Sequence, residues 1–387
     1  MPQPNQPQPQ APDPSEGVVL GRFTGLKNTV DFHELTPQEL SRAVNVDIDD
    51  SGRLVSRRGY TRKVPGVFHS LYNTIEGVVL GVKDGTLGII NPDFTFTNLR
   101  AGIGVNLAAG DLGLAYEQIK RTIYFTSRTD SGKIDLDALT CSPWGDPQDI
   151  WLSPVVNPTP TLAPIAGRLL GAPPLATTLA YFNGRLYLGQ GPTLWFTELY
   201  LYDLVDRTKT FVQFEGDIVM IGVVADGFYV GTTEGVWFLT PSQAYRPEQA
   251  YGLLKRVRVM DSPVIPGSMV YIPGELANPP QVGTEPDTEM QVAISFLTTN
   301  GFCAGNDGGK CYNLTESKFF FPTMVSAAAA FRRQDGYNQY VAVTNSGGSP
   351  VSTARIGDYV DAQIIRGNVL SAEVAENATI NTVQGAN

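Results

Sequence analysis

Residues 44–49 alternate apolar with polar side chains, and this two-residue period predicts a half-buried β-strand. Turn-forming residues follow at 50–52, where glycine tolerates positive φ and aspartate or serine can bond its own backbone. A returning strand begins at Leu54. The pattern therefore predicts a β-hairpin over residues 44–58.

A loosely repeated unit begins near residue 75, in which an apolar strand, a turn and an aromatic, β-branched strand end in Gly or Thr. The clearest copies cover residues 180–197, 224–240 and 299–314. With weaker copies included, the units end near positions 81, 126, 189, 231, 274, 305 and 344. Repeats of roughly 40 to 50 residues are typical of propeller blades. We therefore expect an all-β fold, a β-propeller of six to eight blades, with seven as the central value.

Two intervals depart from this spacing. Residues 141–178 are rich in proline, which central strands exclude, so they are expected to form an excursion from a blade edge. The interval from 274 to 305 is short for a blade. Residues 274–288 are acidic and rich in Pro and Gly, so a second excursion is the alternative to a seventh blade there.

The sequence divides into four parts. Residues 1–16 are a Pro/Gln tract, expected to be an extended or disordered arm that is either solvated or docked on a neighbouring subunit. Within residues 17–74, Thr36 and Glu39 have the spacing of a capping box and predict a short helix to about Ala43. The propeller is expected over residues 75–370 and a C-terminal arm over 371–387, with the hairpin and the C-terminal strands closing the ring.

Composition agrees with many short strands. The 387 residues include 40 Gly and 28 Pro, and such turn density favours strands over helices. A net charge of −10 argues against a protein that grips nucleic-acid phosphates, whereas an acidic wall would let DNA slide past. Since the sequence has neither a secretory leader nor an apolar run of about 18 to 20 residues, we expect a soluble protein made inside a cell, without membrane insertion.

Few residues have a pattern typical of catalysis. The two histidines, His33 and His69, precede the repeats, which argues against a histidine metal centre or a Ser-His-Asp triad. Cys141, Cys303 and Cys311 lack zinc-type spacing, although the last two could face each other across a hairpin. We therefore expect no catalytic residue, no metal and no cofactor.

Acidic pairs and aromatic residues leave alternatives open. The pair Asp135 and Asp137, or Glu215 and Asp217, could form the carboxylate couple of a glycosidase, although carboxylates at strand ends more often face solvent. The aromatic residues of the repeats could stack on a ligand, but their recurrence favours packing between blades. That set is Tyr181, Phe182, Tyr187, Trp195, Phe196, Phe228, Tyr229, Trp237 and Phe238, with Trp195 and Trp237 expected at equivalent, largely buried positions.

Basic residues cluster twice. The first cluster consists of Arg53, Arg57, Arg58, Arg62 and Lys63, and the second of Lys255, Arg256 and Arg258. In an acidic protein, both clusters fit an acidic protein surface better than DNA. The first cluster, which follows the hairpin turn, is our candidate assembly contact.

The N-terminal region resembles the β-propeller nozzle proteins of short-tailed bacteriophages, the tubular tail protein B-like family. The likeness covers residues 23–60 and rests on the segment 23–28, Asn45, the acidic turn, the basic pair Arg57 and Arg58, and Tyr60. The chain is about half the length of the larger nozzle proteins, so their platform or fibre-docking insertions are not expected here.

This resemblance implies a structural, non-enzymatic component of a phage tail, a nozzle or tail-hub ring that forms part of the channel for genome ejection. The implied partners are further copies in a ring, a hexamer being favoured, together with a portal or adaptor protein and tail fibres or spikes. DNA would pass without specific binding, and the virion would assemble in the host cytoplasm. Two alternatives stay open, a propeller-fold glycan hydrolase or lyase (a depolymerase) and a peptide-binding propeller.

Overall fold

The computed structural model describes fifteen stretches of the chain. They are residues 23–41 without 24, 46–48, 52–56, 63–66, 68–104, 112–145, 170–241, 254–273, 292–315, 318–325 without 319, 320 and 322, 326–334, 337–345, 360–366, 369–373 and 383–385. Side chains are not described for residues 32, 46–48, 333–337 and 360–385.

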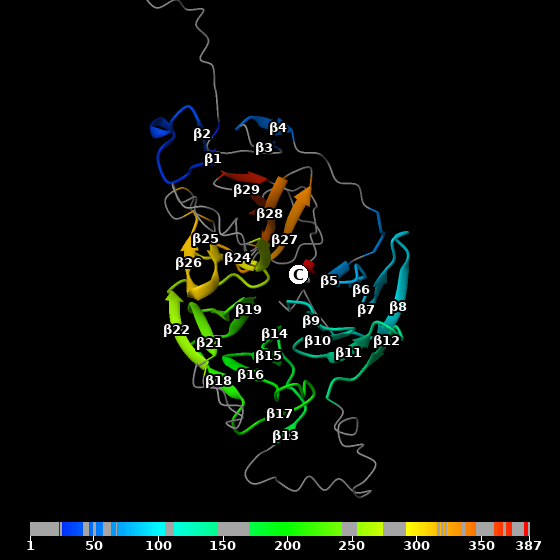
Figure 1. The fold of residues 1–387 in the computed structure, drawn as a ribbon. Coiled ribbons are helices and arrows are strands. Elements are labelled where there is room, and N and C mark those ends of the chain that lie inside the picture. The colour runs from blue at the N-terminus through cyan, green and yellow to red at the C-terminus, as the bar shows by residue number, and fades with distance from the viewer. Residues whose placement is uncertain are drawn as a thin grey trace, which may run out of the picture.

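Six antiparallel sheets form the body of the molecule (Figure 1). Blade 1 contains β5 (Phe68–Asn73), β6 (Val79–Lys83), β7 (Thr86–Ile90) and β8 (Phe96–Ala101); blade 2 contains β9 (Ala115–Ile119), β10 (Thr122–Thr126), β11 (Ser131–Asp135) and β12 (Thr140–Ser142); blade 3 contains β14 (Thr178–Phe182), β15 (Arg185–Gln190), β16 (Thr193–Phe196) and β18 (Phe211–Gln213). Blade 4 contains β19 (Ile218–Val224), β20 (Gly227–Thr232), β21 (Val236–Pro241) and β22 (Leu254–Met260); blade 5 contains β23 (Val270–Pro273), β24 (Val292–Thr298), β25 (Gly301–Gly305) and β26 (Cys311–Asn313); blade 6 contains β27 (Ser326–Gln334), β28 (Tyr337–Asn345), β29 (Val360–Arg366) and β30 (Val369–Glu373).

These sheets are the blades of a β-propeller, so the expected fold class is confirmed. Their number within the described residues is six, at the lower end of the expected range, and the favoured seventh blade is not among them. The reason lies in the short interval: position 274 follows β23 and position 305 ends β25, so both belong to blade 5. The other five repeat ends fall on the second strand of a blade, whereas 305 ends the third strand of blade 5.

Glycines of the second strands lie where the next blade approaches closely. A Cβ atom on Gly189 would come within 2.7 Å of Ile218, the first residue of blade 4. A Cβ on Gly231 would come equally close, 2.7 Å, to Val264, which precedes blade 5. The repeated glycine is therefore required by packing between blades, which explains why it marks the repeat in the sequence.

Five clusters of buried side chains fill the spaces between consecutive blades, in the part of the chain whose side chains are described. The aromatic residues of the repeats contribute to them: Tyr187 and Phe228, for example, pack across blades 3 and 4 with ring centroids 4.5 Å apart. Packing between blades, the favoured interpretation of these residues, is thus what they do. Residues 146–169 and 274–291, which hold most of the first expected excursion (141–178) and all of the second, lie outside the described residues.

The ring is joined at its centre by the C-terminal strand β31 (Val383–Gly385). This strand pairs in parallel with β5 of blade 1 and also lies against β27 and β23. Figure 1 accordingly places the C-terminus at the middle of the ring. The N-terminal hairpin, expected to take part in closure, instead forms a sheet of its own, in which β3 (Val46–Ile48) pairs with β4 (Leu54–Ser56) and β3 lies beside β30 of blade 6.

The expected helix over residues 36–43 is wrong. The side chain of Glu39 does accept a hydrogen bond from the backbone N–H of Thr36 (3.1 Å), as a capping box requires. The chain nevertheless continues as β2 (Glu39–Leu40), which pairs with β1 (Gly25–Leu26), while the only helical turn in this described segment is the 3-10 turn Phe32–Glu34. Tertiary packing decides the outcome, because Leu26 and Leu40 join the apolar cluster between blades 5 and 6.

Two further short strands, β13 (Leu170–Gly171) and β17 (Val205–Asp206), pair at the edge of blade 3. Adjacent strands of a blade run antiparallel, so the turns joining strands 1 and 2 and those joining strands 3 and 4 leave the blade at the same end. We call this end of the propeller the turn face and the opposite end the linker face. No helix in the described part of the chain is long and apolar enough to cross a membrane.

Candidate functional site

A buried carboxyl group lies near the axis of the propeller. Glu117 is on β9, the axial strand of blade 2, and shares a face with Ala115 and Ile119, which pack towards blade 3. The backbone N–H of Tyr181 on β14 hydrogen-bonds its carboxylate. Tyr72 of blade 1 and Tyr271 of blade 5 are close enough for the charge on Glu117 to raise the pKa of both phenols. Groups from blades 1, 3 and 5 therefore surround this carboxyl.

Burial raises the pKa of Glu117 to about 8, and only the hydrogen bond from Tyr181 acts in the opposite direction. Although the side chain keeps some accessible surface, the protein around it removes most of the solvation that a carboxylate needs. Glu117 is therefore mostly protonated at neutral pH. A neutral carboxylic acid can donate a proton or a hydrogen bond, which is the chemistry of a general acid.

Sequence reasoning missed Glu117. Its neighbours Tyr116 and Gln118 are buried and face blade 1, and only the alternation along β9 indicates that Glu117 faces the other side. An acidic residue at the centre of an inner strand was the available signal, because buried acids are rare unless they are paired.

The candidate assembly contact is described only in part. Arg53 and Lys63 are exposed on the hairpin and on the segment that leads to blade 1. Arg57, Arg58 and Arg62 lie outside the described residues. Between them, Leu54 and Val55 of β4 are 40% and 44% exposed, so this hairpin presents apolar as well as basic side chains.

The second basic cluster is engaged within the protein. It lies on β22, the outer strand of blade 4, where the guanidinium groups of Arg256 and Arg258 lie 4.9 and 5.4 Å from the ring of Trp237. Arg256 also donates to the carbonyl of Gln213 (2.6 Å), and Arg258 forms an ion pair with Glu215 (3.2 Å). These arginines connect blade 4 to the segment leaving blade 3, while Lys255 is exposed.

Trp195 and Trp237 occupy equivalent positions, since each follows the residue paired with a second-strand glycine. Both side chains are partly buried, and each packs against an apolar cluster between blades, Trp195 between blades 2 and 3 and Trp237 between blades 3 and 4. Each lies on the third strand, towards the outside of the ring. Trp195 packs on Phe211 within its own blade at 5.3 Å, and Trp237 packs on Phe214 at 6.0 Å.

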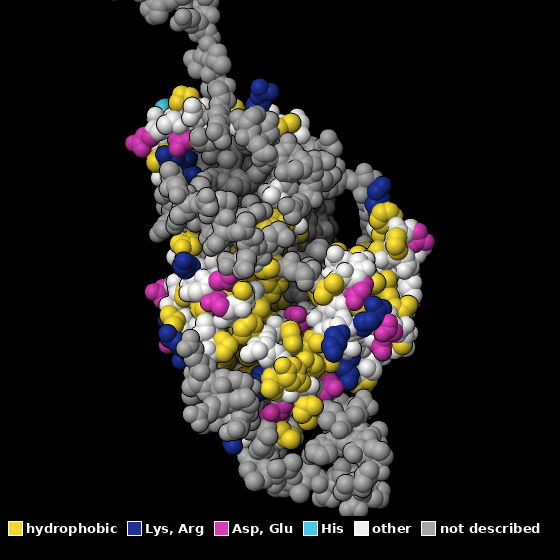
Figure 2. Space-filling view, in the orientation of Figure 1, with side chains coloured by type: hydrophobic (Ala, Val, Ile, Leu, Met, Phe, Trp, Pro, Cys, Tyr) yellow, Lys and Arg dark blue, Asp and Glu magenta, His cyan; other side chains and the backbone are white. Residues whose placement is uncertain are grey.

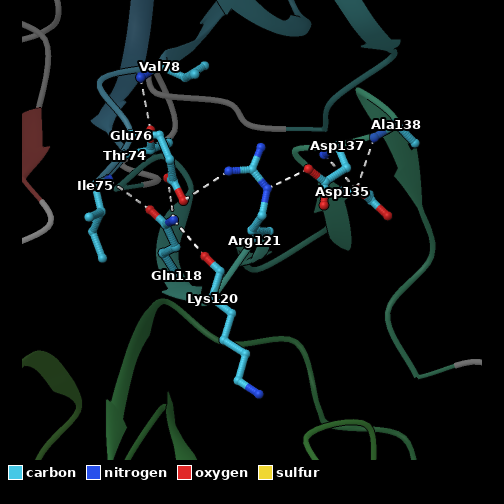
Figure 3. A network of polar contacts seen from close by, with 10 residues as sticks. All are labelled: Thr74, Ile75, Glu76, Val78, Gln118, Lys120, Arg121, Asp135, Asp137 and Ala138. Atoms are coloured by element: carbon cyan, nitrogen blue, oxygen red, sulfur yellow. Dashed lines mark hydrogen bonds and ion pairs between the residues drawn. The ribbon is translucent and has the colours of Figure 1, made fainter.

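The acidic pairs serve local structure. Asp135 accepts hydrogen bonds from the backbone N–H groups of Asp137 and Ala138, which lower its pKa and keep it ionised (Figure 3). Asp137 binds Arg121, which also pairs with Glu76. Glu215 pairs with Arg258, and the backbone N–H of Asp217 donates to Thr233. An ionised, backbone-bound Asp135 does not have the raised pKa that the general acid of a glycosidase needs.

The histidines and cysteines have structural surroundings. His33 is exposed, whereas His69 is partly buried, with Nδ1 2.8 Å from the Ser70 hydroxyl and its pKa lowered by burial. Cys141, Cys303 and Cys311 form no disulfide, and Cys303 and Cys311 lie on β25 and β26 two residues out of register. Within the described stretches, no three His, Cys, Asp or Glu side chains gather to hold a metal ion.

Apolar side chains also gather on the surface. Figure 2 shows a concentration of hydrophobic side chains over β14 to β17 of blade 3. The connection between β16 and β17 contributes Tyr200 and Leu201, which are 67% and 50% exposed. Exposed apolar groups of this size commonly mark a surface that another molecule covers.

No protein-family model matches the sequence, and no curated protein is similar to it. Solved structures are similar in fold. BBS1N, crystallised in complex with ARL6DN, is 12% identical with a TM-score of 0.41 over 78% of this chain and 84% of that one. Streptogramin B lyase is 11% identical with a TM-score of 0.36 over 78% of this chain and 91% of the lyase. PorZ, a surface component of the type-IX secretion system of Porphyromonas gingivalis, is 10% identical with a TM-score of 0.36, and the match covers 79% of this chain but only 39% of PorZ.

Proposed function

We propose that this propeller is a structural component of a bacteriophage tail, a nozzle or tail-hub ring that forms part of the channel for genome ejection. The observation that carries the proposal is the hairpin beside blade 6, which holds Leu54 and Val55 exposed next to the basic Arg53. Apolar groups with basic neighbours on an exposed edge are typical of a surface that becomes buried on assembly. The resemblance of residues 23–60 to nozzle proteins gives the assembly its class.

The partners in this proposal follow from charge. A chain with a net charge of −10 repels phosphates, so DNA passes the ring without specific binding. The basic residues 53–63 meet an acidic surface on a neighbouring copy, on a portal or adaptor protein, or on tail fibres or spikes. We favour a homo-hexamer, incorporated into the virion after assembly in the host cytoplasm.

The test is complementation of a phage that lacks this protein. Changing the exposed Arg53 together with Arg57 and Arg58 to Glu should leave the thermal unfolding temperature unchanged, because charge changes outside a core usually cost little stability. It should nevertheless prevent incorporation into virions through like-charge repulsion. The matched control is Lys255→Glu on the outer strand of blade 4, which should assemble normally. Normal incorporation of the triple variant would exclude this hairpin as the contact, and absence of the wild-type protein from virions would refute the structural role.

A glycan hydrolase or lyase is the second candidate, and the protonated Glu117 near the axis is the observation that favours it. In that case the purified protein should depolymerise capsular or envelope glycans. Glu117→Gln should reduce the rate by about 100-fold or more, as expected on removal of a general acid. The exposed Glu234 provides a control, because Glu234→Gln should leave the rate unchanged. Absence of cleavage by the wild-type protein would remove this candidate and leave the structural one.

A further inference from the structure

Three successive blades present a large apolar side chain from the same turn. Phe94, Leu139 and Tyr200 lie in the connections between the third and fourth strands of blades 1, 2 and 3, all on the turn face. They are 51%, 49% and 67% exposed. Each also has a positive φ, of 66°, 51° and 59° respectively. The combination recurs at equivalent positions in consecutive repeats, so it is a property of this face of the ring.

A positive φ and an exposed large apolar side chain are each unfavourable in an isolated molecule. In the left-handed region the Cβ atom crowds the following carbonyl, so glycine and asparagine are the usual residues there, and a bulky side chain is an outlier. Exposing the same side chains to water adds no compensating burial. Backbone strain that persists at equivalent sites is a reason to search for a bound partner.

A polar network connects the turn that carries Leu139 to the turn between the first and second strands of blade 1. Arg121 forms ion pairs with Asp137, in the turn that carries Leu139, and with Glu76, in the first turn of blade 1 (Figure 3). Gln118 donates to Glu76 (2.6 Å) and accepts from the backbone N–H of Ile75 (2.9 Å), a further apolar residue of this face, 64% exposed. Leu139 and Ile75 therefore project from turns that are tied to each other, which lowers the entropic cost of binding there.

The N-terminal arm of the chain has the chemistry to cover this surface. Its first fourteen residues contain six prolines, at positions 2, 4, 7, 9, 12 and 14, and the first twelve carry no charged side chain. Proline-rich segments dock in the polyproline II conformation on aromatic and apolar surfaces with little loss of entropy. At about 3.1 Å per residue, the 22 residues that precede Phe23 could extend roughly 68 Å.

The exit point of the arm favours a neighbouring copy as its target. The backbone N–H of Phe23 donates to the carbonyl of Gly52 (2.8 Å), which fixes the start of the described chain to the hairpin beside blade 6. Figure 1 shows this hairpin on the opposite side of the ring from β17 of blade 3. A contact from the arm of one copy to the turn face of the next is heterologous, and such contacts form a ring when the rotation between copies closes.

We propose that the Pro/Gln arm, residues 1–14, of one copy binds the apolar turns of blades 1–3 on the next copy. Phe94, Leu139 and Tyr200 supply the apolar contacts and the neutral prolines supply the ligand. This inference rests on the homo-oligomeric ring of the proposed function and names the surfaces that build it.

The experiment compares three full-length proteins: the wild type, the variant Phe94→Asn/Leu139→Asn/Tyr200→Asn, and the control Leu175→Asn/Val325→Asn. The control residues are 37% and 55% exposed on the linker face without a positive φ. Light scattering measures assembly, with and without a synthetic peptide of residues 1–14. A photo-crosslinker at Gln8 identifies the docking site by mass spectrometry in a mixture of isotope-labelled and unlabelled copies.

We expect wild type and control to assemble, excess peptide to dissociate them, and crosslinks to join Gln8 to residues 91–95, 136–139 or 197–201 of another copy. The triple variant should associate at least tenfold more weakly and unfold at an equal or higher temperature, since asparagine tolerates positive φ. Assembly of the triple variant like the wild type would overturn the proposal while the ring stands. If the triple variant fails to assemble but the peptide leaves wild-type assembly unchanged, two turn faces pair with each other. That result would also overturn the proposed docking of the arm. If the wild type is monomeric but its turns still crosslink to the peptide, the arm docks as proposed and the homo-oligomeric ring is refuted. If the wild type neither assembles nor crosslinks, the docking and the ring are both refuted.

Discussion

Blade 5 and blades 1–3 build the same turn from opposite kinds of residue. Between its third and fourth strands, blade 5 has Gly308 and Gly309 at φ 73° and 71°. Phe94, Leu139 and Tyr200 adopt similar angles in blades 1–3. The glycine turn is what backbone physics favours. The propeller fold therefore does not impose the apolar turns, because it accepts glycine in an equivalent place.

Strain of this kind is large relative to the stability of a domain. A left-handed residue with a Cβ atom costs about 1–2 kcal/mol, and three of them cost several kcal/mol out of a typical 5–15 kcal/mol. Blades 1–3 therefore carry a cost in the monomer that blade 5 does not. Binding across the turn face would offset it.

The largest effect should come from placing leucine in the blade 5 turn at Gly309. In addition to the positive φ, a Cβ there would meet the ring of Phe238 at 2.7 Å. Strain and overpacking together should lower the free energy of unfolding by about 2–4 kcal/mol, measured by chemical denaturation. An unchanged stability would mean that this turn can relax, and the contrast with blades 1–3 would lose its energetic basis.

Blades 2 and 3 have a second unusual feature, the buried carboxyl group near the propeller axis, since Glu117 lies in blade 2 and its hydrogen-bond donor Tyr181 in blade 3. Its folded pKa of about 8 exceeds the ordinary value of 4.5, so the folded chain retains a proton that the unfolded chain releases. The free energy of unfolding should therefore fall as pH rises from 4.5 to about 8, by at most about 1.4 kcal/mol per pH unit, less for the accessible part of the side chain.

Glu117→Gln removes the titrating group while keeping its shape. Denaturation curves of the variant should lose this decline, so that it exceeds the wild type in stability above pH 8. Identical pH profiles for the two proteins would show that Glu117 is solvated as in the unfolded chain, and the candidate general acid would be withdrawn.

Replacing Gly308 with leucine measures the cost of a positive φ without a steric clash. No atom lies within 4 Å of the Cβ that this change adds, so only the positive φ opposes it. The expected loss of stability is about 1–2 kcal/mol, smaller than at Gly309. If both glycines respond equally, the clash with Phe238 contributes nothing and the whole cost is conformational.

Much of the fold was accessible from sequence because local patterns and tertiary packing agree there. The glycines at 81, 189 and 231 mark second strands, and at 189 and 231 the adjacent blade leaves no room for a side chain. The blade count was less accessible. Position 274 is also a glycine after an apolar strand, but that strand is β23, the first of a blade. Only the pairing of β23 with β24 shows that it belongs to blade 5.

The sites were harder to predict, because they depend on contacts between distant residues. Thr36 and Glu39 form the predicted capping contact, yet pairing of β2 with β1 overrides the helix. Glu117 acquires its raised pKa from burial among strands that are far apart in sequence. The positive φ of Phe94 and Leu139 could likewise not be predicted, because sequence patterns place a positive φ at glycine or asparagine.

The smallest effect tests the turn of blade 2 directly. Leu139→Asn keeps the turn while placing a residue that tolerates left-handed φ, so the monomer should gain about 0.5–1 kcal/mol of unfolding free energy. Leu175→Asn is the matched control, since Leu175 is 37% exposed on the linker face without a positive φ, and should change stability by less than about 0.5 kcal/mol. Both values come from urea denaturation at protein concentrations where the chain is monomeric. A loss of stability at Leu139 would show that this side chain stabilises the isolated blade, and it would then belong to the core rather than to a surface that awaits a partner.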